Sequence, residues 1–155
     1  METFELKSIG RIRREGEDVA VLIDEAYRPA LRDLGHFSHV MVFFWPNRFE
    51  EPQMREVLVV DLPYAEGHQS GVFATRSPMR PNPVLMTTCK ILGVDEEQGV
   101  VRLAEMDAFD GTPVLDLKAY FPVCDRVKQA HIPEWLQGWP EWMPEEGIGL
   151  EEYER

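Results

Sequence analysis

The stretch VLDLKAYF, residues 114–121, carries the clearest structural signal in the chain. Apolar residues occupy every second position, namely Leu115, Leu117, Ala119 and Phe121. The positions between them carry polar groups, namely Asp116, Lys118 and Tyr120. A repeat of two is the period of a β-strand, because successive side chains of a strand point to opposite faces. The stretch therefore predicts a strand with one buried face.

Other short apolar runs indicate further strands, at residues 37–45, 55–62, 84–94 and 100–106. A turn-like DEEQG separates the last two runs, so residues 84–106 are expected to form a hairpin. Helical signals are weak, and the best of them, residues 27–34, spans only about two turns. Many short strands joined by turns rich in Gly and Pro favour a mainly β fold, either an antiparallel barrel or a sandwich.

The composition bounds the class of protein. A chain of 155 residues with 44% hydrophobic and 10% aromatic residues can form one folded domain with a real core. No apolar run approaches the roughly 20 residues that a membrane helix needs, and no hydrophobic block follows the N-terminus as in a signal peptide. Cys89 and Cys124 form no paired motif. These features predict a soluble cytoplasmic protein.

Charge is unevenly distributed along the chain. Residues 133–155 hold seven acids and one base, a net of −6 out of the total of −12. This acidic segment also carries Trp135, Trp139 and Trp142, and it is expected to pack on the barrel or on a partner subunit. We therefore divide the chain into a barrel domain, residues 1–132, and a tail, residues 133–155. A net charge of −12 argues against nonspecific nucleic-acid binding.

Several common functional motifs are absent from the sequence. It contains neither of the usual glycine-rich nucleotide loops and no Gly-x-Ser-x-Gly nucleophile motif. The four histidines do not form a metal-binding pattern, and His36 and His39 would point to opposite faces of a strand. No metal is predicted.

The segment GVFATRSPMRPNP, residues 71–83, has the composition of a binding loop. Its three prolines fix their own φ angles and bias the preceding residues toward extended backbone, so the loop is expected to be stiff. Stiffness reduces the entropy lost when a ligand binds. Between Gly67 and Val94 the chain has no acidic residue, but it carries Arg76, Arg80 and Lys90. The guanidinium groups could clamp a carboxylate or phosphate, or they could pair with surface acids.

A second informative segment is MDAFDGTPVLDLKAY, residues 106–120. Asp110-Gly111 is a strong turn signal, and Thr112-Pro113 leads directly into the predicted strand. On that strand Asp116 and Lys118 share the polar face, either as functional groups or as a solvent-facing ion pair.

Four segments in this order, SIGRI, FSHVMVFFW, GVFATRSPMRPNP and DGTPVLDLKAYFP, resemble the TsaA/TrmO-like family, also called YaeB-like. The resemblance runs from about residue 7 to 125. It implies a small antiparallel β-barrel with a few short helices that binds S-adenosyl-L-methionine, often as a homodimer. It also implies a methyltransferase that modifies N6 of threonylcarbamoyladenosine beside the anticodon of tRNA. No membrane association is implied.

Motif by motif, the resemblance implies a set of cofactor-binding residues. In the proline loop and just beyond it these are Arg76, Ser77, Arg80, Asn82 and Met86. In the turn and at the end of the FSH strand they are Asp110, Gly111, Thr112, Pro113, Phe44 and Trp45. Arg28 occupies the region where relatives carry a Pro-Arg-Gln segment. We further expect Asp116 to take up the proton of the acceptor and Lys90 and Lys118 to contact the substrate.

The chain departs from the family pattern at one informative place. Relatives continue the proline loop as PNPIGLS, whereas this chain reads PNPVLMT, with Leu85 in place of glycine and Thr87 in place of serine. A large side chain therefore stands where backbone can approach a ligand closely. This departure and the acidic charge keep two alternatives open, a methyltransferase for a small molecule and a noncatalytic S-adenosyl-L-methionine-binding module.

Overall fold

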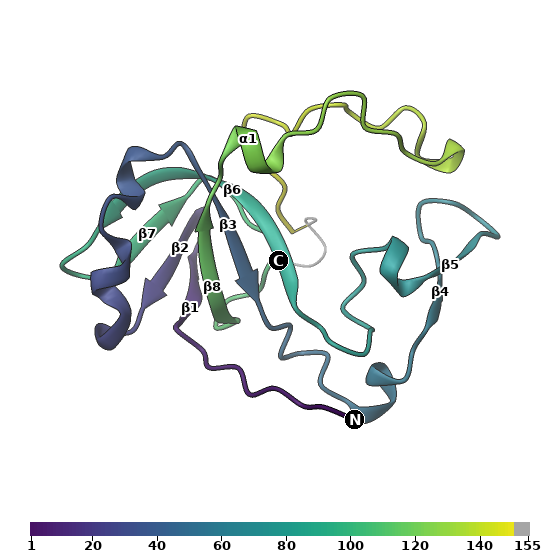
Figure 1. The fold of residues 1–155 in the computed structure, drawn as a ribbon, viewed down its shortest axis with the longest axis horizontal. Coiled ribbons are helices and arrows are strands. Elements are labelled where there is room, and N and C mark those ends of the chain that lie inside the picture. The colour runs from purple at the N-terminus through teal and green to yellow at the C-terminus, as the bar shows by residue number, and fades with distance from the viewer. Residues whose placement is uncertain (151–155) are drawn as a thin grey trace.

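Six strands of the computed structural model, which describes residues 1–150, close into an antiparallel barrel in the order β1-β2-β7-β6-β3-β8 (Figure 1). The strands are β1 (Gly10–Glu15), β2 (Asp18–Ile23), β3 (His39–Phe44), β6 (Leu85–Asp95), β7 (Val100–Leu103) and β8 (Pro113–Ala119). The predicted mainly β barrel is confirmed. The sandwich alternative is wrong, because β8 pairs back to β1 and closes the sheet.

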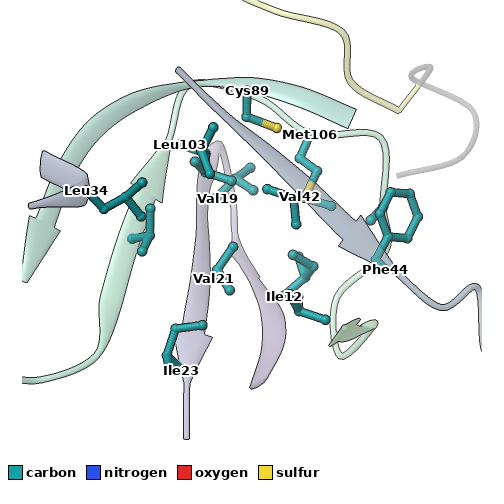
Figure 2. Close-up of a cluster of buried hydrophobic side chains, with 14 of the residues drawn as sticks. Ile12, Val19, Val21, Ile23, Leu34, Val42, Phe44, Cys89, Leu103 and Met106 are labelled. Carbon is teal, nitrogen blue, oxygen red and sulfur yellow. The ribbon is translucent and has the colours of Figure 1, made fainter. Parts of the chain in front are cut away.

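The barrel interior is filled mainly by branched aliphatic side chains of the strands, together with Phe44, Cys89 and Met106 (Figure 2). On β3, for example, Val40, Val42 and Phe44 are buried, and the residues between them are half-buried. The innermost side chains, each 1% exposed or less, include Ile12, Val21, Val42, Val101 and Val114. Burial of this apolar surface provides the main driving force for closing the ring.

The register of β8 differs from the prediction. Val114 fills the core, whereas Leu115 remains half-buried outside the core cluster. The cause is an irregularity in the β3–β8 pairing, where Phe43 lies opposite Asp116 but Phe44 lies opposite Val114. Such a bulge inserts an extra residue and changes which side chains face inward. Two expected residues do pack against the core, Leu117 and Ala119. Phe121 lies beyond the strand and is 47% exposed, so its predicted burial is wrong.

The hairpin of β1 and β2 was not predicted from the sequence. Arginines flank Ile12 on β1, so the strand carries little of the apolar alternation that identifies strands. The turn between the two strands contains Gly16 at φ 65°, a left-handed conformation that favours glycine. The predicted hairpin of residues 84–106 is confirmed as β6 and β7, with a register shift between Ile91 and Gly93.

Two other predicted elements take a different form. Residues 27–34 do not form an α-helix; the structure has the 3₁₀ helices η1 (Glu25–Leu31) and η2 (Leu34–His36) instead. The interior Pro29 of η1 lacks the N–H that a regular helix needs. The expected strand at 55–62 shortens to β4 (Val59–Asp61), which pairs with β5 (Gln69–Gly71) in a separate two-stranded sheet.

Residues 46–84, here called the arm, project from one side of the barrel (Figure 1). The arm holds η3 (Pro52–Arg55), the β4–β5 sheet, η4 (Val72–Ala74) and the proline loop. After β8 the chain forms α1 (Pro122–Asp125) and η5 (Glu134–Leu136) and passes beside the arm. Aromatic contacts join the two, with ring centroids 4.0 Å apart for His68–Trp135 and 5.2 Å apart for Tyr64–Trp139. Residues 151–155 of the tail lie outside the described part.

None of the helices in residues 1–150 is both long and apolar enough to span a bilayer.

Candidate functional site

The arm and the loop before β8 enclose a cavity of about 180 Å³ at the Phe44 end of β3, here called the loop cavity. Its wall includes Phe44, Arg76, Leu85, Phe109 and Thr112. These residues come from four segments of the chain, namely β3, the proline loop, β6 and the loop before β8. Barrel closure therefore brings the proline loop and the DGTP turn, far apart in sequence, to one site.

A second cavity of about 200 Å³, here called the proline-loop cavity, adjoins the first. Both cavities share Phe44, Arg76, Leu85 and Asp107 in their walls. Arg80 and Met86, two predicted cofactor-binding residues, line the second cavity. The two cavities together form one candidate site, whose shared wall combines the apolar side chains of Phe44 and Leu85 with the exposed charged groups of Arg76 and Asp107.

Hydrogen bonds within the proline loop explain its shape. The Thr75 hydroxyl accepts a bond from the Ser77 N–H at 3.2 Å, and the Ser77 hydroxyl accepts one from the Met79 N–H at 3.2 Å. The Arg80 guanidinium folds back and donates to the carbonyls of Thr75 at 3.0 Å and Ser77 at 3.3 Å. Such local bonds favour turns over regular structure. The loop is thus braced by its own side chains as well as by its prolines.

The two loop arginines are therefore not equivalent. Arg80 donates hydrogen bonds to the backbone of the loop. Arg76 is exposed and donates a long hydrogen bond, 3.4 Å, to the Met86 carbonyl. Arg76 also borders both cavities. A guanidinium in this position retains donors for an anionic ligand. Ser77 is occupied in the turn, and the exposed Asn82 lines neither cavity.

The loop that precedes β8 is held by Arg14 of β1. The Arg14 guanidinium lies 2.9 Å from Glu105 and donates to the carbonyls of Met106 and, at 2.7 Å, Ala108. The Arg14 N–H donates to the Asp110 carboxylate at 2.8 Å. Asp110 therefore helps to fix the turn, and it lines neither cavity.

The rest of the DGTP turn shapes the wall. Gly111 adopts φ 79°, which a side chain would disfavour, and Thr112 is buried at 2% exposure in the wall of the loop cavity. The Pro113 carbonyl accepts a bond from the Trp45 N–H at 3.0 Å. The half-buried Trp45 indole donates to Glu50 at 2.8 Å, so its ring is turned toward the arm and lines neither cavity.

Four predicted residues lie apart from the candidate site. Asp116 and Lys118 form an ion pair of 2.7 Å on the outer side of β8, and both side chains are at least half exposed. Asp116 borders a different cavity of about 410 Å³ between η1 and the barrel. Lys90 lies opposite His39 in the β3–β6 register. Arg28 donates to the Glu97 carbonyl at 3.0 Å, beside the β6–β7 turn.

Among the residues of the site that were not singled out from the sequence are Arg48, Asp107 and Phe109. Arg48 lies over the Phe109 ring at 4.1 Å in a cation–π contact. Asp107 is an exposed carboxylate in the wall of both cavities. Asp107 and Phe109 belong to the MDAFDGTP segment. Their position directly before the Asp110-Gly111 turn is the sequence feature that could have identified them as site residues.

Buried titratable chemistry lies elsewhere. Desolvation by burial and, to a lesser extent, the nearby Glu105 carboxylate raise the pKa of the Cys89 thiol from 9.0 to about 12. Cys89 faces the barrel core and is fully buried, so it cannot act in the cavities. Within residues 1–150 there is no cluster of three His, Cys, Asp or Glu side chains suited to a metal ion.

Comparison with known proteins agrees with this architecture. A sequence model of the tRNA-methyltransferase O N-terminal domain matches residues 10–126. An S-adenosyl-L-methionine-binding protein of Archaeoglobus fulgidus is 34% identical over 120 residues, which cover 77% of this chain and 80% of that protein. A tRNA (adenine(37)-N6)-methyltransferase of Mus musculus is 41% identical over 103 residues, which cover 66% of this chain and 23% of the mouse protein.

Two solved structures have a similar fold. A crystal structure of TrmO superimposes with a TM-score of 0.67 at 28% identity over 84% of this chain. The TrmO structure from Pseudomonas aeruginosa gives 0.65 at 26% identity, also over 84%. The chain spans 64% and 61% of the length of these two proteins. Because the matched domain covers the barrel, the arm and the DGTP turn, this chain belongs to the tRNA-methyltransferase O family.

Proposed function

We propose that the chain binds S-adenosyl-L-methionine across the loop cavity and the proline-loop cavity and transfers its methyl group to N6 of threonylcarbamoyladenosine in tRNA. The observation that carries this proposal is the meeting of Arg76, Asp107 and Phe44 in the walls of both cavities. The bound cofactor supplies an electrophilic methyl group. The residues of the chain bind and orient the two reactants.

The charged groups suit the amino-acid end of the cofactor. A carboxylate ligand fits the exposed Arg76 guanidinium, and an ammonium group fits the Asp107 carboxylate. Arg80 contributes indirectly, since its bonds to the Thr75 and Ser77 carbonyls keep the loop in shape. The proposal therefore assigns binding to Arg76 and positioning to Arg80.

The apolar walls suit an adenine ring. Phe44, Leu85 and Phe109 line the loop cavity, and Met86 lines the neighbouring one. Ligand sites commonly combine such apolar walls with a few placed polar groups. Leu85 stands where relatives carry glycine, so it narrows the space shared by the two cavities.

The tRNA acceptor is supported by the name of the mouse relative, a tRNA (adenine(37)-N6)-methyltransferase. Lys90 and Lys118 remain proposed substrate contacts, reached by an acceptor that extends over the outer faces of β6 and β8. Asp116 has weaker support as proton acceptor because its carboxylate is paired with Lys118 and borders another cavity. A homodimer and a cytoplasmic location are likewise proposals.

The archaeal relative is named only as a binding protein, which favours a noncatalytic S-adenosyl-L-methionine-binding module as the second candidate. Labelled S-adenosyl-L-methionine distinguishes the candidates when it is incubated with the protein and with tRNA from a strain that lacks the family enzyme. Label in tRNA supports the main proposal. Label in a small-metabolite extract alone points to another acceptor, and label in neither fraction supports the binding module.

Calorimetry tests the binding site itself. We expect Arg76→Ala to weaken S-adenosyl-L-methionine binding by roughly tenfold or more, because a charge-assisted bond is lost. Arg11→Ala is the matched control, since Arg11 is an exposed arginine of β1 outside both cavities. Equal affinity of the two variants would overturn the assignment of Arg76. Binding of tRNA that does not weaken with salt would contradict a phosphate-mediated acceptor contact.

A further inference from the structure

The C-terminal tail returns to the candidate site at Leu150. Leu150 is only 6% exposed and forms part of the wall of the loop cavity. The large side chains that precede it in the tail remain open to solvent, such as Trp142 at 60% and Ile148 at 54%. Among residues 133–150, burial is thus concentrated at Leu150, which lines the cavity.

Two glycines allow the tail to lie against the barrel at this point. A Cβ on Gly149 would lie 2.1 Å from Cγ of Glu105, and one on Gly147 would lie 3.6 Å from Cβ of the same residue. Gly147 also adopts φ 89°, a conformation that L side chains rarely adopt. A bulkier residue at position 149 would therefore push the tail away from its seat.

Glu105 cannot easily move aside to accept a larger tail residue. Its carboxylate pairs with Arg14 at 2.9 Å, and the two side chains are only 16% and 12% exposed. Arg14 in turn holds the carbonyls of Met106 and Ala108. The seat of the tail is consequently part of the same brace that shapes the loop cavity.

The tail is also anchored on the arm. Trp135 and Trp139 contact His68 and Tyr64 near the β4–β5 sheet, and Trp142 accepts a cation–π contact from Arg126 at 4.7 Å. These aromatic contacts are exposed to solvent, so each contributes little to the free energy that holds the tail in place. A tail fixed by several weak contacts can be released without unfolding the barrel.

We propose that residues 144–150 form an intramolecular gate, in which Leu150 occupies space that the apolar part of S-adenosyl-L-methionine requires. With Leu150 in place the loop cavity measures about 180 Å³. The adjoining proline-loop cavity measures about 200 Å³, so with Leu150 in place the two cavities together lie near the lower end of the range of about 300 to 1,000 Å³ for ligand pockets. The inference rests on the proposed function, because it takes the loop cavity as part of the cofactor site.

When only some molecules have an open gate, the apparent affinity for S-adenosyl-L-methionine equals the affinity of the open form multiplied by the fraction of open molecules. Displacing the tail should therefore tighten binding, whereas a tail that served as a wall for the ligand would weaken binding when displaced. The two roles predict opposite signs for the same variants.

Calorimetry of the full chain with S-adenosyl-L-methionine tests the gate. Leu150→Ala removes the occupant, and Gly149→Val displaces the tail by its clash with Glu105. Both should bind the cofactor roughly 3- to 30-fold more tightly than the unchanged protein. Ile132→Ala, at an exposed position outside both the gate and the two cavities, should leave the affinity unchanged.

Three results would overturn the gate. Unchanged affinity in both displaced variants would exclude it while leaving the proposed function intact, and weaker binding would show that the tail is a wall of the site. Absence of binding by every form would reject the proposed function, and the gate with it. As a second readout, amide exchange at residues 147–150 should increase when the cofactor is added; increased protection there would contradict release of the tail.

Discussion

The guanidinium of Arg14 and the carboxylate of Glu105 lie 2.9 Å apart, across the join between β1 and the loop that leads to the DGTP turn. Both side chains are largely buried. Removal of one partner would leave the other charge in a poorly solvated place and release two carbonyls that Arg14 holds. The Arg14–Glu105 pair is therefore expected to contribute substantially to the free energy of unfolding.

We expect Arg14→Ala to lower the free energy of unfolding by about 2–3 kcal/mol, because a nearly buried ion pair and its additional hydrogen bonds are lost. Chemical denaturation followed by tryptophan fluorescence would measure the change. The neighbouring Arg13 is the control, since its contact with Glu15 is longer, 3.7 Å, and exposed. Arg13→Ala should change stability by less than about 0.5 kcal/mol. Equal effects of the two substitutions would contradict a special role for Arg14.

Within the arm, Arg55 of η3 connects the segment around Phe49 to the proline loop. Its guanidinium donates to the carbonyls of Phe49 and, at 3.1 Å, Pro78, while its Nε and Nη1 are buried and bond no group within residues 1–150. Arg55→Met should change the free energy of unfolding by less than about 1 kcal/mol, because relief of two unpaired donors offsets the lost bonds. Binding of S-adenosyl-L-methionine should nevertheless weaken several-fold as the loop loosens.

Gln53→Met provides the control for Arg55→Met, since the Gln53 side chain is exposed and bonds only Glu51 in the described chain. It should leave affinity unchanged in calorimetry. Unaltered affinity of Arg55→Met would show that the proline loop keeps its shape without this connection.

The two cysteines should differ sharply in reactivity. Burial raises the pKa of Cys89 to about 12, so at pH 8 this thiol is protonated as well as inaccessible. Cys124 is exposed. Mass spectrometry after treatment with a maleimide should find one modified thiol per native chain and two after denaturation. Cys124→Ser should abolish labelling of the native protein, and labelling of Cys89 in the folded state would contradict its burial.

The raised pKa of Cys89 also determines the direction in which the stability of the protein changes with pH. The unfolded thiol ionises near pH 9.0, whereas the folded thiol stays protonated to about pH 12. The contribution of Cys89 to stability is therefore complete below pH 9 and declines as the pH rises toward 12. A Cys89→Ala variant should show a shallower loss of stability across this range in denaturation experiments.

Leu85 gives a prediction about the departure from the family pattern. Leu85→Gly should lower the free energy of unfolding by about 1–3 kcal/mol, because a half-buried side chain of β6 is removed and backbone freedom is gained. It should also raise affinity for S-adenosyl-L-methionine, since Leu85 narrows both cavities. Leu92→Gly, at an exposed position of the same strand outside both cavities, is the control for affinity. Weaker cofactor binding by Leu85→Gly would show that this side chain is a contact rather than an obstruction.

The strands that could be predicted were those whose apolar residues formed a visible pattern. β3 and the β6–β7 hairpin carry dense β-branched and aromatic runs, and the structure confirms them. β1 could not be found in this way, because its barrel-facing Ile12 stands among arginines. The register of β8 was wrong because a bulge depends on the partner strand, and no local pattern encodes it.

The residues of the candidate site could likewise be predicted only where a local sequence pattern revealed them. The arginines of the proline loop were visible from composition, and Arg76 does border both cavities. The different use of Arg80 could not be foreseen, because it depends on how the loop carbonyls turn. Leu150 and Arg14 reach the site only through the closed barrel and the returning tail, so their places follow from long-range contacts.

The ring of strands is completed in part by the turn that precedes β8. Ile12 donates its N–H to the Thr112 carbonyl at 2.9 Å, and the Gly111 N–H donates to the Ile12 carbonyl at 2.9 Å. The same turn thus fastens the first strand to the last and forms a wall of the loop cavity. A ligand that binds against this wall would stabilise the connection between β1 and the turn before β8. The melting temperature of the whole barrel would therefore rise when this single site is occupied.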